Sequence, residues 1–192
     1  MGAHLTRSYP GASDSSGCVT HQPPLALMPT ATMPKKSAGL LLYRQTSDES
    51  EFEVLLVHPG GPFWRNKDAG AWTIPKGEFK DDEDSLTAAK REFEEETGAP
   101  PPNGEFIPLK PVKQSSAKTI YVWAVEGDLD TAGVRSNTFQ HEWPPKSGRM
   151  REFPEIDRAE WFTPADARQK ILKGQAPLID QLLSRLETRT AV

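Results

Sequence analysis

Residues 77–98 read GEFKDDEDSLTAAKREFEEETG and carry nine carboxylates against three basic side chains. Acidic runs of this kind are usually solvated helix faces or disordered tails. The apolar residues of this run, however, recur at helical spacing, as Leu86, Ala89 and Phe93. This period predicts an amphipathic helix over residues 84–97 with one face turned toward a core.

Both ends of the predicted helix carry suitable residues. Asp82 or Asp84 can cap the amino end by accepting a hydrogen bond from a free backbone N–H. Gly98 suits the left-handed conformation that ends many helices, and the three prolines that follow forbid continuation.

Three glutamates share one face of this helix. Glu92, Glu95 and Glu96 stand at positions i, i+3 and i+4, which places their Cβ atoms about 5–6 Å apart. Three like charges at that distance repel one another, and a divalent cation removes the repulsion. Carboxylate oxygens without cysteine or histidine nearby favour a hard ion, and Mg²⁺ keeps coordination positions open for substrate phosphates. The helical ligand segment also differs from an EF-hand loop.

The fixed positions of this segment resemble the signature of the Nudix hydrolase family, G-x5-E-x7-R-E-U-x-E-E-x-G-U. Every charged and glycine position of the signature is filled, and Ala99 stands where a larger aliphatic residue is usual. The lead-in WTIPKG at residues 72–77 is also similar to that of many members. The tight match covers residues 72–99, and a looser match runs from about residue 38 to residue 173. The matching positions are Gly77, Glu83, Arg91, Glu92, Glu95, Glu96 and Gly98.

The resemblance implies hydrolysis of a nucleoside diphosphate linked to another group, with water attacking phosphorus. Mg²⁺ would be the cofactor, with Mn²⁺ as a possible substitute, because a metal ion lets an acidic helix meet a polyanion. By position in the signature, the metal ligands would be Glu92, Glu95 and Glu96, joined by the carbonyl of Lys76. Glu83 and Arg91 would form a salt bridge that fixes the orientation of these ligands.

Within the family the chain is most similar to the MutT-like branch of asymmetric diadenosine tetraphosphate hydrolases. The similarity lies in the lead-in, in the segment Lys118–Tyr121, and in a glutamate six residues before Trp161. Lys118 would contact an outer phosphate and Tyr121 would stack on a base, although an ordinary strand residue is an equal alternative for Tyr121. Glu155 would be an additional metal ligand or a general base. The alternatives are a pyrophosphatase that removes nucleoside triphosphates such as oxidised dGTP, and a nucleotide-binding sensor without catalysis.

Other charged or aromatic residues have weaker patterns. The loop at residues 58–70 is long and rich in glycine and proline, which favours a functional role. Trp64, Arg65 and Lys67 in this loop are candidates for base or phosphate contacts, and Lys76 is a further candidate for substrate binding. Lys146, Arg149 and Arg151 suit a polyphosphate or a solvated surface equally. Glu142 and Glu152 are alternatives to Glu155, whereas His58 and His141 lack ligand spacing and are interpreted as structural residues.

The remaining pattern predicts an α/β fold, a Nudix-type α/β/α sandwich with a mixed sheet and the catalytic helix at residues 84–97. Residues 133–154 are expected to be irregular. Strands are predicted at residues 40–42, 52–57, 106–112, 119–125 and 160–162, and further helices at residues 164–173 and 177–187.

The composition limits the domain organisation and the partners. Residues 1–34 are expected to form a disordered tail, residues 35–188 one Nudix domain, and residues 189–192 a flexible end. A net charge of −4 does not favour general binding to nucleic acid or anionic membranes. Cys18 is the only cysteine, and no signal sequence is apparent, so we expect a cytoplasmic protein. Its expected partner is a small nucleotide or polyphosphate, with a monomeric or weakly dimeric state.

Overall fold

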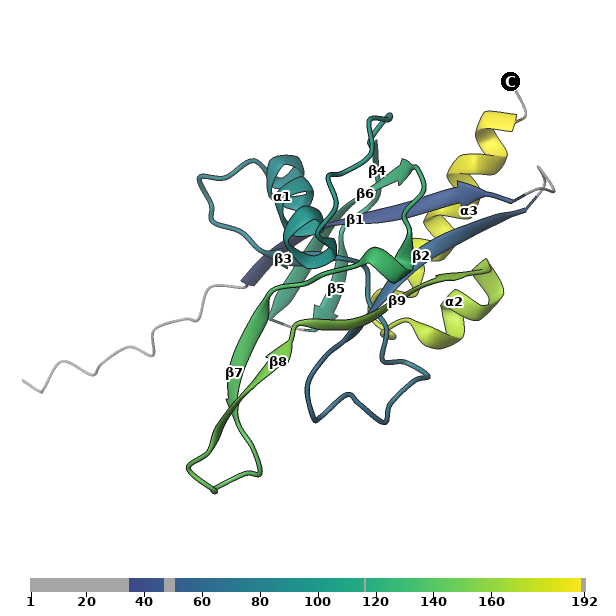
Figure 1. Ribbon diagram of the computed structural model, residues 1–192. Helices are drawn as coiled ribbons and strands as arrows, with labels where there is room; N and C mark the ends of the chain where they lie inside the picture. The colour runs from purple at the N-terminus through teal and green to yellow at the C-terminus, as the bar shows by residue number, and fades with distance from the viewer. Residues whose placement is uncertain (1–34, 47–50, 116, 191–192) are drawn as a thin grey trace, which may run out of the picture. The chain divides into compact units, whose positions relative to one another are not determined.

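The computed structural model describes residues 35–46, 51–115 and 117–190 (Figure 1). The predicted tail at residues 1–34 lies outside these residues. One sheet of seven strands forms the centre of the domain, with helices on its two faces. Its strands are β1 (Lys35–Gln45), β2 (Phe52–Pro59), β3 (Lys76–Glu78), β4 (Ile107–Pro108), β5 (Val112–Ser115), β6 (Lys118–Glu126) and β9 (Ile156–Phe162).

The sheet is mixed, and β1 lies in its middle. The strand order is β4-β6-β1-β2-β9, with β3 also paired to β1 and β5 paired to β6. β1 and β6 are parallel, whereas the other pairs are antiparallel. The residues of β1 are continuously buried from residue 37 to residue 43, as expected for a strand covered on both faces.

Alternate residues of β1 belong to two hydrophobic clusters, one on each face of the sheet. Leu40 and Leu42 pack in a cluster with Ala88, Ala89 and Phe93 of the helix α1 (Ser85–Thr97). The opposite cluster contains Leu41 and Tyr43 of β1. It also contains side chains of α2 (Pro164–Lys170) and α3 (Pro177–Thr190). Helices therefore cover both faces of the sheet, and the predicted α/β/α sandwich is confirmed.

The helix α1 has the ends that its sequence predicts. Asp84 rather than Asp82 is the cap, and its carboxylate accepts a hydrogen bond from the Thr87 N–H at 2.9 Å. Gly98 adopts a left-handed φ of 74°, and its N–H donates to the Glu94 carbonyl at 2.8 Å. The last two turns of α1, which carry the three glutamates, are therefore held by local hydrogen bonds and by the buried Phe93.

The prediction of irregular structure at residues 133–154 is wrong. After a short 3₁₀ helix, η1 (Thr131–Gly133), the strands β7 (Thr138–Glu142) and β8 (Met150–Pro154) form a separate two-stranded hairpin. This hairpin projects from the domain beyond the end of the main sheet (Figure 1). Among the described residues, no helix is long and apolar enough to cross a membrane.

Candidate active site

Arg91 joins the acidic residues of the signature. Its Nη1 lies 2.7 Å from Glu92 Oε1 and 3.2 Å from Glu95 Oε2, and its Nε lies 3.1 Å from Glu83 Oε1. The hydrogen bond to Glu83 is the main cause that raises the pKa of Arg91 above its ordinary value. The guanidinium therefore stays charged and holds three carboxylates around it, as the resemblance implies for Glu83 and Arg91.

The strand β3 brings a second set of groups against the same helix face. The Lys76 N–H donates to Glu96 Oε2 at 2.8 Å. The Glu92 carboxylate lies directly over Gly77, where a Cβ atom would come within 1.7 Å of Glu92 Oε2. A glycine at residue 77 is therefore required if Glu92 is to keep this position.

Burial disfavours the charges of these carboxylates. It raises the pKa of Glu96 to about 7, and the negative charges of Glu92 and Glu155 add to the effect. Burial also raises the pKa of Glu92, with smaller contributions from Glu95 and Glu155. The exposed Glu155 is thus near enough to act electrostatically on both helix residues.

The donor set of this face fits a hard divalent cation. Its donors are carboxylate oxygens, and burial raises the pKa of Glu92 and Glu96 although the charges of Arg91 and Lys76 oppose that shift. In the described residues no group of three or more histidine, cysteine, aspartate or glutamate side chains already stands in a metal-holding arrangement. Instead, Glu92 and Glu95 bind Arg91, and Glu96 accepts from the Lys76 N–H. The ligand roles of Glu92, Glu95, Glu96, Glu155 and the Lys76 carbonyl stay predictions.

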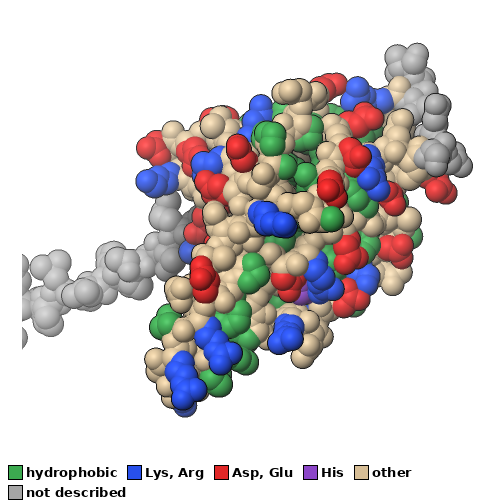
Figure 2. Space-filling view, viewed as in Figure 1, with side chains coloured by type: hydrophobic (Ala, Val, Ile, Leu, Met, Phe, Trp, Pro, Cys, Tyr) green, Lys and Arg blue, Asp and Glu red, His purple; other side chains and the backbone are tan. Residues whose placement is uncertain are grey.

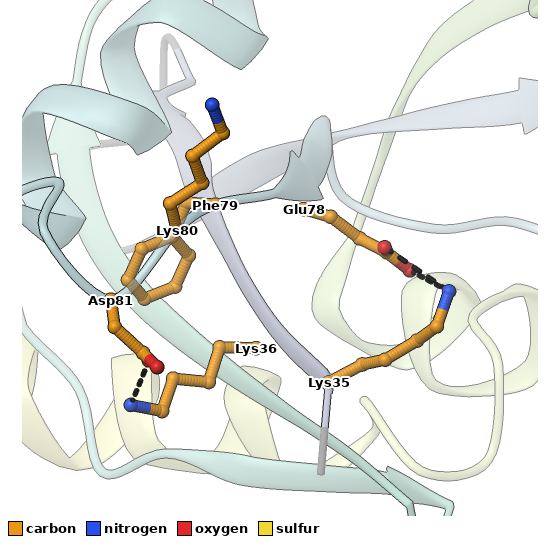
Figure 3. Close-up of a pocket in the computed structure, with 6 residues that line it drawn as sticks. All are labelled: Lys35, Lys36, Glu78, Phe79, Lys80 and Asp81. Carbon is orange, nitrogen blue, oxygen red and sulfur yellow. Dashed lines mark hydrogen bonds and ion pairs between the residues drawn. The ribbon is translucent and has the colours of Figure 1, made fainter. Parts of the chain in front are cut away.

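A lysine-rich pocket is lined by residues of β1 and of the segment that begins in β3 (Figure 3). It has a volume of about 370 Å³ and lies at the start of β1, between that strand and the segment that follows β3. Lys35 Nζ binds Glu78 Oε1 at 3.0 Å, and Lys36 Nζ binds Asp81 Oδ1 at 2.8 Å. The residues that line it are Lys35, Lys36, Glu78, Phe79, Lys80 and Asp81.

The predicted substrate residues Lys118 and Tyr121 belong to this neighbourhood. Lys118 Nζ lies 3.5 Å from Glu78 Oε1, opposite Lys35. The Tyr121 ring packs edge-to-face on Phe79, with 5.8 Å between the ring centres. A second pocket shares Glu78, Phe79 and Lys80 with the first and continues to Glu83 and Arg91. The basic pocket therefore leads to the catalytic helix.

The sequence analysis missed most of this pocket. Lys35, Lys36 and Phe79 were not among the predicted site residues. Two consecutive lysines next to the apolar part of β1 are the local signal. The contact of Lys35 with Glu78, however, depends on the pairing of Ser37 with Glu78 in the sheet.

Lys76 is placed differently from the other lysines. It is half-buried, and burial lowers the pKa of its ammonium group, while the charge of Glu96 opposes that shift. It therefore lies between the carboxylates and the basic pocket, where its predicted role in substrate binding stays a prediction.

Other predicted residues lie outside the glutamate face and the lysine-rich pocket. Trp64 packs partly buried against the core beside Lys67, whose Nζ lies 4.6 Å from the indole centre, and Arg65 is exposed. Within the described ranges, no contact joins Trp64 or Arg65 to the glutamates. His58 is fully buried, with Nε2 donating to the Lys67 carbonyl and Nδ1 2.7 Å from Asp157 Oδ1. These contacts agree with its structural interpretation.

The two alternatives to Glu155 lie on the hairpin. Glu142 Oε1 accepts from the Gly148 N–H at 2.7 Å, and Glu152 accepts from the Thr138 hydroxyl. The carboxylate of Glu155, by contrast, has no hydrogen bond or ion pair with a described residue. Of the three, Glu155 alone contributes to the pKa shifts of the helix glutamates.

Solved structures share this fold. The chain aligns with the C. elegans Ap4A hydrolase in a binary complex at 22% identity and a TM-score of 0.55, over 80% of this chain and 98% of that chain. It aligns with the NUDIX domain of Shewanella oneidensis NrtR complexed with ADP ribose at 19% identity and a TM-score of 0.51, over 79% and 87% of the two chains. A MutT/nudix family protein from Listeria innocua aligns at 14% identity and a TM-score of 0.54, over 83% and 98%.

The sequence itself matches one family model. A search of curated proteins found no match. The model of the NUDIX domain, however, matches residues 33–182, which include the sheet, the catalytic helix and the hairpin. The chain therefore belongs to the NUDIX family and is a hydrolase that acts on phosphoanhydride bonds.

Proposed function

We propose that the protein is a Mg²⁺-dependent pyrophosphohydrolase of dinucleoside polyphosphates such as diadenosine tetraphosphate. The observation that carries this proposal is the junction of a half-buried carboxylate face with a lysine-rich pocket. Carboxylates alone repel a polyphosphate, and lysines alone bind it without activating water. Together they suit a substrate whose phosphates lie partly on a metal ion and partly on ammonium groups.

Each part of the site has a role in this reaction. When bound, the divalent ion neutralises charge on the phosphates and favours attack by water. Glu92, Glu95 and Glu96 hold the ion, and Arg91 keeps Glu92 and Glu95 in position. These roles account for a glutamate face that would otherwise be repulsive.

Water must also lose a proton as it attacks. Glu155 is suited to accept this proton, because its carboxylate is not committed to another described residue and its charge acts on Glu92 and Glu96. Proton transfer to a positioned carboxylate typically contributes 10²–10⁴-fold in rate.

The basic pocket supports a substrate with several phosphates. Lys35 and Lys118 both present their ammonium groups to Glu78, and Lys36 presents a third to Asp81 on the other side of β1. Glu78 and Asp81 are exposed or half-exposed carboxylates. Phosphate oxygens compete well with such surface ion pairs, which contribute little to stability. Phe79 lines the same pocket as Lys36 and contacts the Tyr121 ring. These two rings suit contact with a nucleobase.

The fold relatives support a nucleotide substrate. One is an Ap4A hydrolase, and another is complexed with ADP ribose. Both molecules contain nucleotides joined through phosphoanhydride bonds, which is the chemistry proposed here.

A substrate panel tests the proposal. The full chain is incubated with Mg²⁺ and diadenosine tetraphosphate, 8-oxo-dGTP, ATP or ADP ribose, and products are separated by ion-exchange chromatography. Addition of water to diadenosine tetraphosphate should give ATP and AMP, with kcat/KM at least tenfold above that for the other compounds. A preference for 8-oxo-dGTP would assign the protein to nucleotide sanitation instead, and binding without turnover would assign it to nucleotide sensing.

A further inference from the structure

The projecting hairpin has one aromatic and basic face. Phe139 pairs with Phe153 across the two strands, and His141 pairs with Arg151. Directly opposed residues in an antiparallel pair extend to the same side, and alternate residues share that side. Figure 2 shows Lys/Arg and apolar side chains together on this projection.

A segment of the 58–70 loop packs on this face. A Cβ atom at Gly61 would lie 3.0 Å from the Phe139 ring, so the backbone approaches that ring closely. The Phe63 ring is edge-to-face with His141 at 5.3 Å and with Trp143 at 5.7 Å. The Phe63 side chain nevertheless stays 55% exposed, so part of a supported aromatic ring is open to solvent.

The hairpin that supports this ring also carries three cations. Arg151 lies opposite His141, which contacts Phe63, and Lys146 and Arg149 lie in or beside the turn of the hairpin. All three are exposed, and none forms an ion pair with a residue that the structure describes. An open aromatic ring beside unpaired cations matches the chemistry of a nucleotide, which offers a flat base for stacking and phosphates for charge pairing.

The root of the hairpin is part of the candidate active site. The Glu155 N–H donates to the Asn137 carbonyl, and the Gly60 N–H donates to the Glu155 carbonyl, both at 2.8 Å. Glu155 therefore fixes both the hairpin and the loop that carries Phe63. His141 is three residues from the root pair of Thr138 and Pro154, which is roughly 10 Å along a strand.

We propose that the hairpin and Phe63 bind the second nucleoside of the substrate, at the end remote from the lysine-rich pocket. One nucleotide occupies the pocket of Lys35 and Lys118, the polyphosphate crosses the glutamate face, and the second base stacks on Phe63. Arg151 contacts the adjoining phosphate or ribose. This inference rests on the proposed function, because it requires a substrate with two nucleosides.

Two nucleotides of equal phosphate number test the second subsite. Adenosine 5′-tetraphosphate lacks the second adenosine and carries additional negative charge on its free terminal phosphate, so the effect of a substitution is compared within each nucleotide. Alanine substitution of a stacking residue removes roughly 1–3 kcal/mol per base, and 1.4 kcal/mol corresponds to tenfold. Phe63→Ala should therefore raise KM for diadenosine tetraphosphate about tenfold, with kcat and the KM for adenosine 5′-tetraphosphate changed less than about twofold.

Other substitutions of Phe63 distinguish stacking of a base on an aromatic ring from contact with any apolar side chain. Phe63→Trp should keep the KM of the wild type, whereas Phe63→Leu should raise it as Phe63→Ala does. Met150→Ala is the matched control, because Met150 is 61% exposed on the same hairpin and pairs with Glu142, on the opposite side from the aromatic face. It should leave both KM values unchanged. Equal effects of Phe63→Ala on the two nucleotides, or none on either, would overturn the inference.

A binding measurement keeps the two proposals distinguishable. Calorimetry with Ca²⁺ in place of Mg²⁺ measures the affinity of the full chain for each of the two nucleotides. Tighter binding of diadenosine tetraphosphate that is lost in Phe63→Ala supports the second subsite, whether or not turnover follows. An equal loss of affinity for both nucleotides in Phe63→Ala, or no loss for either, overturns it. If the wild type binds but hydrolyses neither nucleotide with Mg²⁺, the proposed function fails while this binding result still decides the second subsite.

Discussion

The Glu92 carboxylate lies against the Cα of Gly77, in space that any other side chain at residue 77 would occupy. Two residues of one sequence signature are thus related by direct contact between a strand end and a helix face. The distance of 1.7 Å from a Cβ atom to Glu92 Oε2 means that the two groups cannot coexist without movement. The glycine of the signature therefore positions a candidate metal ligand.

Replacing Gly77 by alanine should lower turnover without unfolding the protein. The obstructing atoms belong to the end of a flexible glutamate side chain, so the carboxylate moves and the backbone stays. Misplacement of a ligand by about 1 Å can reduce the rate on the order of 10²-fold. Steady-state kinetics and thermal melting measure the two effects. Gly133→Ala is the control, since its Cβ atom would meet Asp130 at an ordinary 3.6 Å and should change neither.

Glu95→Gln and Glu96→Gln should each remove a charged ligand and leave the helix intact. Loss of several kcal/mol of metal-assisted stabilisation corresponds to a rate loss on the order of 10³ or more. Glu94→Gln is the matched control, because Glu94 lies on the same helix with an exposed side chain and should keep wild-type turnover.

Metal binding by these variants can be measured without turnover. Mg²⁺ should raise the melting temperature of the wild type and of Glu94→Gln, because a ligand that binds the folded state stabilises it. The rise should be smaller or absent in Glu96→Gln. Near-normal turnover of both ligand variants at saturating Mg²⁺ would contradict the metal assignment.

Glu155→Gln should reduce turnover by roughly tenfold to a thousandfold, the range expected for a general base or an auxiliary ligand. Its melting temperature should change little, because its carboxylate binds no other described residue. Glu152→Gln changes a neighbouring carboxylate that bonds only to Thr138 of the hairpin, so its turnover should match the wild type. The assignment fails if both variants behave alike.

The cap of α1 should contribute stability that depends on pH. Hydrogen bonds from the Thr87 N–H and hydroxyl lower the pKa of Asp84 below its ordinary value of 3.8. A lowered pKa means that the charged cap stabilises the fold above pH 3.8, and that this contribution disappears as pH falls through the lower folded value. Asp84→Ala should therefore melt at a lower temperature at pH 7, and the difference from the wild type should shrink below pH 3.8.

Two further substitutions isolate the cap. Asp84→Asn keeps a side-chain acceptor without a charge to titrate, so it should melt near the wild type at pH 7 and lack this dependence on pH. Asp82→Ala removes a neighbouring carboxylate that has no hydrogen bond to a described residue, and it should have no effect. A constant difference between Asp84→Ala and the wild type over the acid range would contradict the cap explanation.

The helix and its glutamates could be predicted because the information is local. The apolar period, the cap at Asp84 and the stop at Gly98 all lie within or next to α1. The start of β1 could not be placed in this way. Lys35, Lys36 and Ser37 have no apolar pattern, and they become a strand because β6 and β3 supply hydrogen-bonding partners distant in sequence.

The hairpin was missed for a related reason. Its strands are short, and the prolines after Trp143 interrupt any long alternation between them. Its aromatic face is completed by Gly61 and Phe63, which come from a loop far earlier in the chain. The lysine-rich pocket likewise depends on sheet register. Neither the aromatic face nor the lysine-rich pocket could be predicted from residues that are neighbours in the sequence.

The separation of the hairpin from the main sheet has an evolutionary consequence. β7 and β8 pair only with each other, and the backbone bonds of Glu155 to Asn137 and Gly60 tie their root to the domain. Mutations that lengthen or shorten this hairpin, or replace its side chains, leave the pairing of β1 with β2, β3 and β6 unchanged. Changes in the hairpin can therefore accumulate without disturbing the sheet that positions α1.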